Sequence, residues 1–220
     1  FNPETDMLDE KSMLALDRWA VAKTLDLQNQ IIDAYKSYNF HLIYQKLHNF
    51  CAVELGGFYL DVIKDRQYTT QENSIARRSA QTAMYHIIEA MTRWLAPILS
   101  FTAEEIWQVI PGAHDESVLL ETWYENLFDL DKSESMNFDF WSNIQETRTY
   151  VSKQLEKLRV AGDIGSSLDA EVTLYCDETL LKQLSALESE LRFALITSEA
   201  SADTLANKSD SAVEVTMESG

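Results

Sequence analysis

Apolar side chains recur at helical spacing along the first two thirds of the chain. Over residues 10–38 an apolar position returns mostly at helical intervals, which predicts a first long helix. Asn39 tolerates a left-handed backbone and is a natural break before a second long helix over residues 40–58. The apolar stripe over residues 76–95 is the most regular of the three and predicts a third helix.

A proline-marked corner follows the third helix. Pro97 has no backbone N–H, so the helix is expected to kink or stop within about one turn of it. Thr102 is expected to begin a short fourth helix, with Glu105 as its partner in a capping box. In the same scheme Phe101 packs on Ile106 as a hydrophobic staple.

Two other features concern helix packing. Gly56 and Gly57 interrupt the second helix at a cost of about 1 kcal/mol each relative to Ala, which favours the close approach of a neighbouring helix at this point. Trp19 and Trp94 lie on the apolar stripes of the first and third helices and are expected in the core.

The acidic segment 113–135 has mixed patterning and is expected to wrap the bundle as a connection with little regular structure. A fifth helix is predicted over residues 138–160, and Gly162 stops it. Its apolar positions share one face, and basic side chains near residue 160 suit the negative end of the helix.

The remaining segment changes period. Residues 170–176 alternate as a strand, and residues 180–187 return to a helical pattern. The apolar run 191–196 is expected to form a buried strand, residues 198–211 a polar flexible loop, and residues 213–215 the start of another strand.

These elements predict a mainly α protein, in which an antiparallel helical bundle is followed by a small α/β subdomain. We expect residues 1–135 to form the bundle with its wrapping connection, residues 136–162 a long connecting helix, and residues 163–220 a subdomain truncated at its C-terminus. The chain starts with neither Met nor a signal peptide, so we expect it to be a piece of a longer protein.

The charge of the chain bears on whether it can bind nucleic acid. The formal net charge is −18, from 18 Lys and Arg against 36 Asp and Glu, which argues against contact with nucleic acid. The basic residues nevertheless gather in two sets, and this distribution permits such contact. The sets are Lys64, Arg66, Arg77, Arg78 and Arg93, and then Arg148, Lys153, Lys157 and Arg159.

Several kinds of chemistry are missing. The six glycines form no phosphate-binding loop, and His48 and Cys51, three residues apart, are too few ligands for a zinc site. Cys51 and Cys176 are widely separated and suit reduced thiols in a cytoplasm. No apolar run approaches the 18 or more residues of a membrane span. We therefore expect no catalytic residue, no bound metal or cofactor and no membrane crossing in this chain.

Five segments, in order, resemble the anticodon-binding region and junction subdomain of class I isoleucyl-tRNA synthetases of the bacterial type. They are LDRWAV (16–21), FYLDVIKDRQYT (58–69), ARRSAQTAMYHI (76–87), the corner with APIL and FTAEE (96–105), and DIGSSLDAEVTLY (163–175). The valyl-tRNA synthetases share the general plan of this domain, but the residues of the second and third segments favour the isoleucyl family. The family's His-Ile-Gly-His and Lys-Met-Ser-Lys-Ser signatures, its editing domain and its cysteine-rich zinc segment are absent from this chain.

The resemblance implies a module that positions the anticodon stem and loop of isoleucine tRNA for isoleucylation by a separate catalytic domain. ATP with Mg, and the zinc site, would then belong to the catalytic and C-terminal zinc segments of the parent chain. The candidate tRNA contacts are the two basic sets, for phosphates, and Tyr68, for stacking on an unpaired base. Arg66 is open to pairing with Asp61 or Asp65 instead.

A rival interpretation rests on the acidity. A helical protein-interaction scaffold that binds a basic partner through its acidic surface, with no RNA contact, is consistent with the charge but not with the ordered motifs. An independent enzyme with an unrecognised site has no support in the residues. A cytoplasmic monomer is the simpler expectation.

Overall fold

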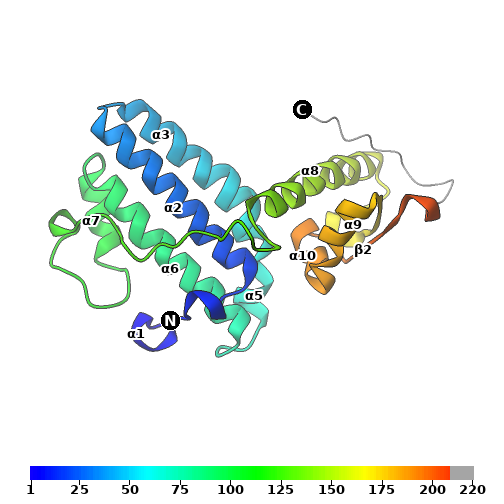
Figure 1. Cartoon of the computed structure of the whole chain (residues 1–220), viewed down its shortest axis with the longest axis horizontal. Coiled ribbons are helices and arrows are strands. Elements are labelled where there is room, and N and C mark those ends of the chain that lie inside the picture. The colour runs from blue at the N-terminus through cyan, green and yellow to red at the C-terminus, as the bar shows by residue number, and fades with distance from the viewer. Residues whose placement is uncertain (209–220) are drawn as a thin grey trace. The chain divides into compact units, whose positions relative to one another are not determined.

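The structure is a computed structural model that describes residues 1–208 and divides into two compact units (Figure 1). The first unit spans Phe1–Asn137 and is built of helices and one long connection. The second unit begins at Phe138 and contains helices and a two-stranded sheet. The mainly α fold followed by a small α/β part is confirmed.

The first unit is a layer of helices. Helix α2 lies between α3 and α6, and α3 runs against the direction of both (Figure 1). Short helices complete the corners of the layer. The helices of this unit are α1 (Pro3–Asp6), α2 (Ala15–Lys36), α3 (Phe40–Asn49), a π-helix (Phe50–Tyr59), α4 (Leu60–Val62), α5 (Lys64–Thr69), α6 (Ile75–Leu95) and α7 (Ser100–Trp107).

The core between these helices includes polar side chains that are hydrogen-bonded. Trp19 is buried and meets the ring of Phe58 edge-on, with ring centroids 5.4 Å apart. Trp94 is buried too, and its indole Nε1 donates to Oε1 of Gln28 at 2.9 Å. The Gln28 amide in turn donates to the Tyr124 carbonyl at 2.9 Å. Both predicted core tryptophans are confirmed, and the bond to Gln28 satisfies the buried indole N–H of Trp94.

The α2–α3 break lies where the sequence predicts it, but the left-handed residue differs. Tyr38 has φ 57°, whereas Asn39 has φ −90° and begins the next helix as its N-cap. An aromatic residue in this region is unusual, because its Cβ crowds the backbone where glycine or asparagine is tolerated.

The glycine pair of the second helix avoids a steric clash, but not the one that the sequence predicts. Gly56 and Gly57 are exposed, so no neighbouring helix approaches them. Here the chain widens into a π-helix, in which hydrogen bonds span five residues. A Cβ on Gly56 would lie 3.0 Å from the Cys51 carbonyl oxygen, and one on Gly57 would lie 3.2 Å from that of Ala52. The close contact is therefore with the preceding turn of the same helix.

The corner at Pro97 confirms one prediction and overturns another. Helix α6 ends at Leu95, as expected, but α7 begins at Ser100, so Thr102 lies inside its first turn and caps nothing. Phe101 is 90 % exposed, which rules out the staple. The Leu99 carbonyl accepts from Ala103 N at 2.8 Å, so the corner itself starts the helix without a side-chain cap.

The carboxylate that makes hydrogen bonds at this corner is the neighbour of the predicted one. Glu104, and not Glu105, accepts from the Ser117 hydroxyl at 2.7 Å and from Val118 N at 3.2 Å. The bond from Ser117 lowers the pKa of Glu104, with a further bond from Gln108 acting in the same direction. Glu104 thus fixes the start of the connection that leaves α7.

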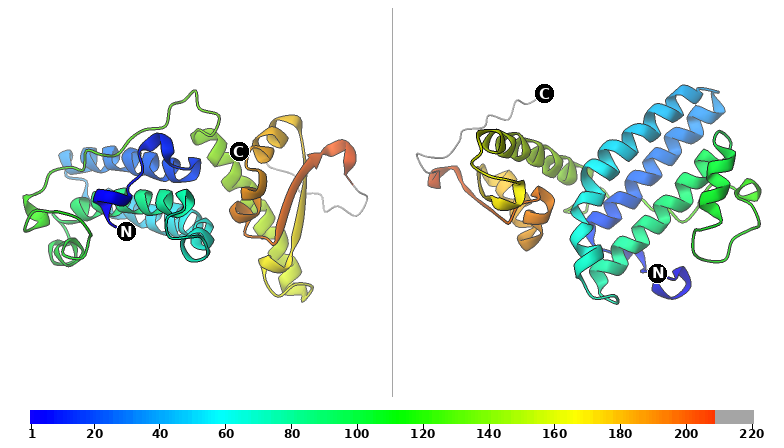
Figure 2. Two further views of the ribbon diagram at one scale, coloured as in Figure 1. Left: turned by 90° about the horizontal axis from the view of Figure 1, so that it is seen from below. Right: turned by 180° about the vertical axis from the view of Figure 1, so that it is seen from behind.

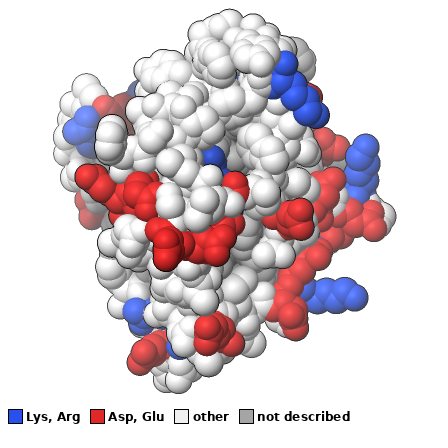
Figure 3. Space-filling view, turned by 90° about the vertical axis from the view of Figure 1, so that its left-hand side faces the viewer, with Lys and Arg blue, Asp and Glu red and all other residues white. Residues whose placement is uncertain are grey.

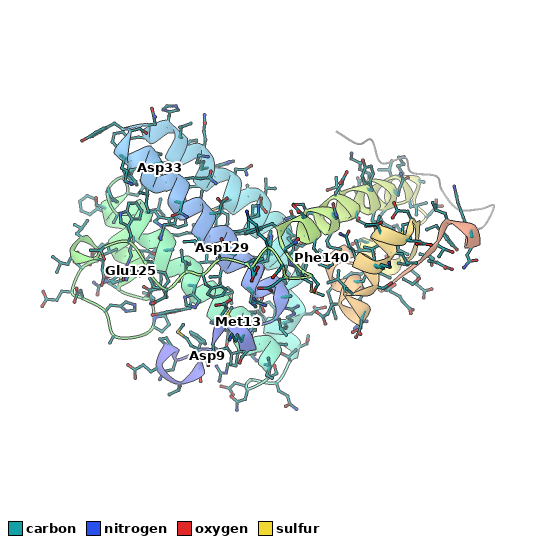
Figure 4. The ribbon with its side chains drawn as sticks, viewed as in Figure 1. Asp9, Met13, Asp33, Glu125, Asp129 and Phe140 are labelled. Atoms are coloured by element: carbon teal, nitrogen blue, oxygen red, sulfur yellow. The ribbon has the colours of Figure 1, made fainter. Side chains whose placement is uncertain are left out.

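That connection, residues 113–137, contains one 3-10 turn, Val118–Leu120, and otherwise irregular backbone, so it has little regular structure, as expected. It runs across α6 and α2 toward the other end of the layer (Figures 1 and 2). Glu125 and Asp129 mark its course in Figure 4. Its buried side chains are Val118, Tyr124, Leu127 and Leu130.

The second unit packs short helices beside a parallel strand pair. Glu171 lies opposite Glu199 in the register, and the two strands are joined by a helical crossover. The elements are α8 (Phe138–Ala161), β1 (Glu171–Cys176), α9 (Glu178–Ser185), α10 (Leu191–Leu195) and β2 (Glu199–Thr204). The predicted fifth helix, first strand and following helix are confirmed, and α8 ends before Gly162, which has φ +85°.

Two predictions in this unit were wrong. The segment predicted as a buried strand is α10, whose buried Leu191, Ala194 and Leu195 follow helical spacing in a run too short for periodicity to decide. The segment predicted as a flexible loop contains β2, which forms because the crossover returns the chain alongside β1. The strand expected at residues 213–215 lies outside the described residues.

We predict that replacing Ser74 by Ala destabilises the first unit by about 1 kcal/mol, because Ser74 is the N-cap of α6 and accepts from Arg77 N at 3.3 Å. Thr102→Ala is the matched control. Thr102 is exposed inside α7, so its loss is expected to change the free energy of unfolding by less than about 0.5 kcal/mol. Urea unfolding of both variants measures the difference. A larger loss at Thr102 than at Ser74 would contradict the observed helix starts.

Candidate functional site

Helix α5 exposes two of the predicted contact residues. Tyr68 is 85 % exposed, and Lys64 projects into solvent at the first turn of the helix. The Lys64 ammonium donates to Oδ1 of Asp61 at 2.7 Å, and this bond raises the pKa of Lys64. Both side chains are therefore accessible, and the lysine is cationic at neutral pH.

Arg66, on the same helix, turns inward. Its Nη1 lies 3.3 Å from Oδ2 of Asp17, a fully buried residue of α2. Asp17 also accepts from the Tyr59 hydroxyl at 2.8 Å and from the Ser79 hydroxyl. Burial raises the pKa of Tyr59, and the Asp17 charge acts in the same direction, so the phenol remains a donor. The cluster joins α2, the end of the π-helix, α5 and α6, and it orients the segment that carries Lys64.

The two arginines at the start of α6 are also largely covered. Nη1 of Arg78 lies 2.8 Å from Oδ2 of Asp6, and its Nη2 donates to Asn73 at 2.9 Å. Arg77 donates to the Thr70 carbonyl at 3.3 Å. These contacts tie α6 to the N-terminal turn and to the α5–α6 corner, so the two arginines hold backbone segments together.

Arg93 fastens the connection to α6. Its Nη1 pairs with the buried carboxylate of Glu89 and its Nη2 lies 2.8 Å from Glu121 in the connection. The guanidinium carbon lies 4.7 Å from the ring centroid of Trp107 and 5.2 Å from that of Tyr124. Two carboxylates and two aromatic faces thus surround one cation, which is a stabilising arrangement for a partly buried charge.

The second basic set lies on α8, in the second unit. Lys153, Lys157 and Arg159 are exposed, whereas Arg148 is half-buried. Both carboxylate oxygens of Glu156 accept from Arg159, at 2.7 and 2.8 Å, and Lys157 donates to Gln154 at 3.2 Å. The exposed members keep their cationic groups at the surface of this helix.

The sequence reasoning passed over a group of exposed aromatic side chains at the α2–α3 turn. Tyr38, Phe40 and Tyr44 are 78 %, 48 % and 69 % exposed. The sequence pattern places Tyr38 within the first predicted helix and Phe40 at the start of the second. One signal was available: residues 34–53 contain no Asp or Glu, in a chain where 36 of 220 residues are acidic.

Within residues 1–208 no group of three or more His, Cys, Asp or Glu side chains is placed to hold a metal ion. Cys51 and Cys176 are free thiols, and partial burial raises the pKa of each. None of the helices described is both long and apolar enough to cross a membrane.

The fold is that of a mainly helical module followed by a small α/β unit. The family model for the anticodon-binding domain of tRNA ligase matches residues 17–174. The chain belongs to this family, which confirms the resemblance noted in the sequence.

Similar full-length proteins are isoleucine–tRNA ligases. The chain is 61 % identical over 220 residues to that of Thioalkalivibrio sulfidiphilus (strain HL-EbGR7), covering all of this chain and 23 % of the relative. It is 53 % identical over 218 residues to that of Marinomonas sp. (strain MWYL1), covering 99 % of this chain and 23 % of the relative. The chain therefore spans about a quarter of the length of the curated relatives it matches.

One buried histidine attaches the connection to α6. His86, on α6, is buried with its Nδ1 2.8 Å from the Tyr124 hydroxyl and its ring against that of Phe128. Burial lowers the pKa of His86 to about 4, an effect that Glu89 partly opposes. The folded chain therefore resists protonation of this ring.

We predict that this histidine contributes stability that is complete above its unfolded pKa of about 6.5 and is lost as pH falls toward 4. The sign follows because the unfolded chain takes up the proton first as pH falls. The loss attributable to His86 is expected to be about 1 kcal/mol between pH 7.5 and 5.5. Urea unfolding at the two pH values measures it, with His86→Gln as the non-titrating control. Parallel pH dependence in both proteins would contradict the assignment.

Proposed function

We propose that this chain is the part of an isoleucine–tRNA ligase that holds the anticodon stem and loop of isoleucine tRNA. A catalytic part elsewhere in the parent protein would use ATP with Mg to join isoleucine to the other end of the tRNA, and a zinc site would also lie outside this chain. The observation that carries the proposal is the family match over residues 17–174, together with 53–61 % identity to isoleucine–tRNA ligases. The same identities favour the isoleucyl over the valyl alternative.

Exposed cations supply the phosphate contacts in this proposal. Lys64 on α5 and Lys153, Lys157 and Arg159 on α8 reach solvent, where they can approach the RNA backbone and set its register. Tyr68 offers an exposed ring for an unpaired base.

The basic side chains that are not exposed have a structural role in the proposal. Arg66, Arg77, Arg78 and Arg93 are paired within the fold, so we assign them to holding the shape of the interface. Arg148 is half-buried and belongs with them.

Two finer points complete the proposal. The two free thiols support a reducing compartment, and we place the activity in the cytoplasm. We infer that the chain acts as a monomer alongside the catalytic and zinc segments of its parent. The acidic scaffold is the alternative outcome of the experiment below.

We predict that Lys64→Gln and Lys157→Gln each weaken binding of isoleucine tRNA and flatten its salt dependence. Each lost phosphate contact should reduce the slope of log affinity against log salt by about 0.9, measured from about 50 to 200 mM salt. Lys132→Gln is the control, because Lys132 is exposed in the acidic connection and is expected to leave the slope unchanged.

The outcomes separate the alternatives. An unchanged slope would remove the substituted lysine from the interface. Preference for isoleucine tRNA over a mismatched tRNA supports recognition of the anticodon side, whereas equal binding of both would leave only phosphate contacts in this chain. Absence of binding at the lowest salt would contradict the proposal and favour the acidic scaffold.

A further inference from the structure

Three aromatic side chains project from the turn between α2 and α3. Tyr38 follows the last turn of α2, and Phe40 and Tyr44 lie one turn apart on α3. They are 78 %, 48 % and 69 % exposed, so about half or more of each side chain is not used by the core. We call Tyr38, Phe40 and Tyr44 the aromatic face.

Ring contacts hold part of this face in place. Phe40 meets Tyr38 edge-on with ring centroids 6.0 Å apart, and it contacts the ring of Tyr35 at the same distance. Tyr35 is anchored below, because its hydroxyl donates to the Trp94 carbonyl at 2.6 Å. Burial raises the pKa of Tyr35 to about 12, which keeps that donor protonated. The exposed rings are thus supported by bonded residues beneath them.

The backbone at Tyr38 is strained. Its φ of 57° lies in the left-handed region, at a helix end where glycine is the favoured residue. A tyrosine at this position stabilises neither the local backbone nor the core. Strain of this kind points to a role outside folding.

The surroundings of the aromatic face suit RNA. Residues 34–53 contain no Asp or Glu and include Lys36, Lys46, His41 and His48. Asp33, at the edge of the face in Figure 4, lies 4.0 Å from the Lys36 ammonium. Seen from this end of the bundle, the upper surface is largely uncharged, and Asp and Glu gather in a band below it (Figure 3). A basic protein partner would be drawn to that band, whereas a polyanion meets least repulsion above it.

We propose that the aromatic face stacks on unpaired bases of the anticodon loop. Base–aromatic stacking needs exposed rings of fixed orientation and does not need a cation at each base. The inference rests on the proposed function, which it deepens by assigning the surface that receives the single-stranded part of the RNA. Lys64 and α8 would then contact backbone phosphates, and the aromatic face would contact bases.

The test uses Tyr38→Gly and Tyr44→Ala in the 220-residue chain, with Phe101→Ala as control. Phe101 is 90 % exposed, more than either tyrosine, but lies beside Glu104 and Glu105. The probes are the stem–loop hairpin of isoleucine tRNA and the same hairpin with abasic loop positions. We expect Tyr38→Gly to unfold at the same or higher urea concentration, since glycine relieves the strain. Affinity for the intact hairpin should nevertheless fall about ten-fold in each tyrosine variant.

Three further readouts follow from stacking. The salt slope should remain that of the unsubstituted chain, because no cation is removed. The abasic hairpin should bind more weakly than the intact one and should not distinguish the variants. Phe101→Ala should bind both hairpins as the unsubstituted chain does.

The failures are distinguishable. Unchanged affinity of both tyrosine variants for the intact hairpin would overturn the aromatic face and leave the proposed function standing, provided that Lys64→Gln still alters the slope. An equal loss on intact and abasic hairpins would overturn stacking. If the unsubstituted chain binds neither hairpin nor tRNA at the lowest salt, both proposals fail. Should Tyr38→Gly destabilise the fold, Tyr44→Ala decides alone, because Tyr44 has an ordinary helical backbone.

Discussion

The buried carboxylate of Asp17 is the constraint on which the arrangement of the first unit depends. A charge removed from water is tolerated only where hydrogen bonds and an opposite charge replace its solvation. For Asp17 these come from Tyr59, Ser79 and Arg66, which belong to three different elements. The end of the π-helix, α5 and α6 must therefore converge on α2 at one point. The orientation of α5, and so the exposure of Lys64 and Tyr68, follows from that convergence.

The need to pair buried carboxylates also explains why several arginines are not exposed. Glu89 is a second buried carboxylate, and it takes Arg93 and His114 as partners. Asp6 takes Arg78. In a chain with twice as many acids as bases, each arginine bound internally is one fewer at the surface. Few cationic side chains are therefore available for recognition at the surface, and the exposed members of the two predicted basic sets lie on α5 and α8.

Sequence reasoning succeeded where the determinant is local and repeated. The apolar stripe of α6 and the stop at Pro97 are examples, since both depend on residues within a few turns. It failed at α7, whose first turn continues the backbone bonds of the preceding corner and needs no cap. It failed again at β2, a polar segment that is a strand only because β1 lies beside it.

Prediction of the candidate site from the sequence also fails where the determinant is not local. The pattern of charges located the basic side chains but not their partners. Arg66 was predicted to contact a phosphate, with a near neighbour as the alternative partner, yet it pairs with Asp17, which lies 49 residues away in sequence. Arg93 likewise reaches Glu121, 28 residues along the chain. Exposure of a charged residue is decided by such long-range pairs, which one sequence does not display.

Net charge is a poor guide to binding in a molecule of this size because repulsion is local. At physiological ionic strength the screening length is about 8 Å, so carboxylates farther than this from a bound phosphate contribute little. What matters is the charge within that distance of the contact. An acid-free stretch of twenty residues, 34–53, removes repulsion along the outer face of α3 without adding many cations. In the proposed complex, such a surface would gain affinity for RNA mainly from stacking, which salt does not screen, and the exposed lysines and arginines would make the binding salt-dependent.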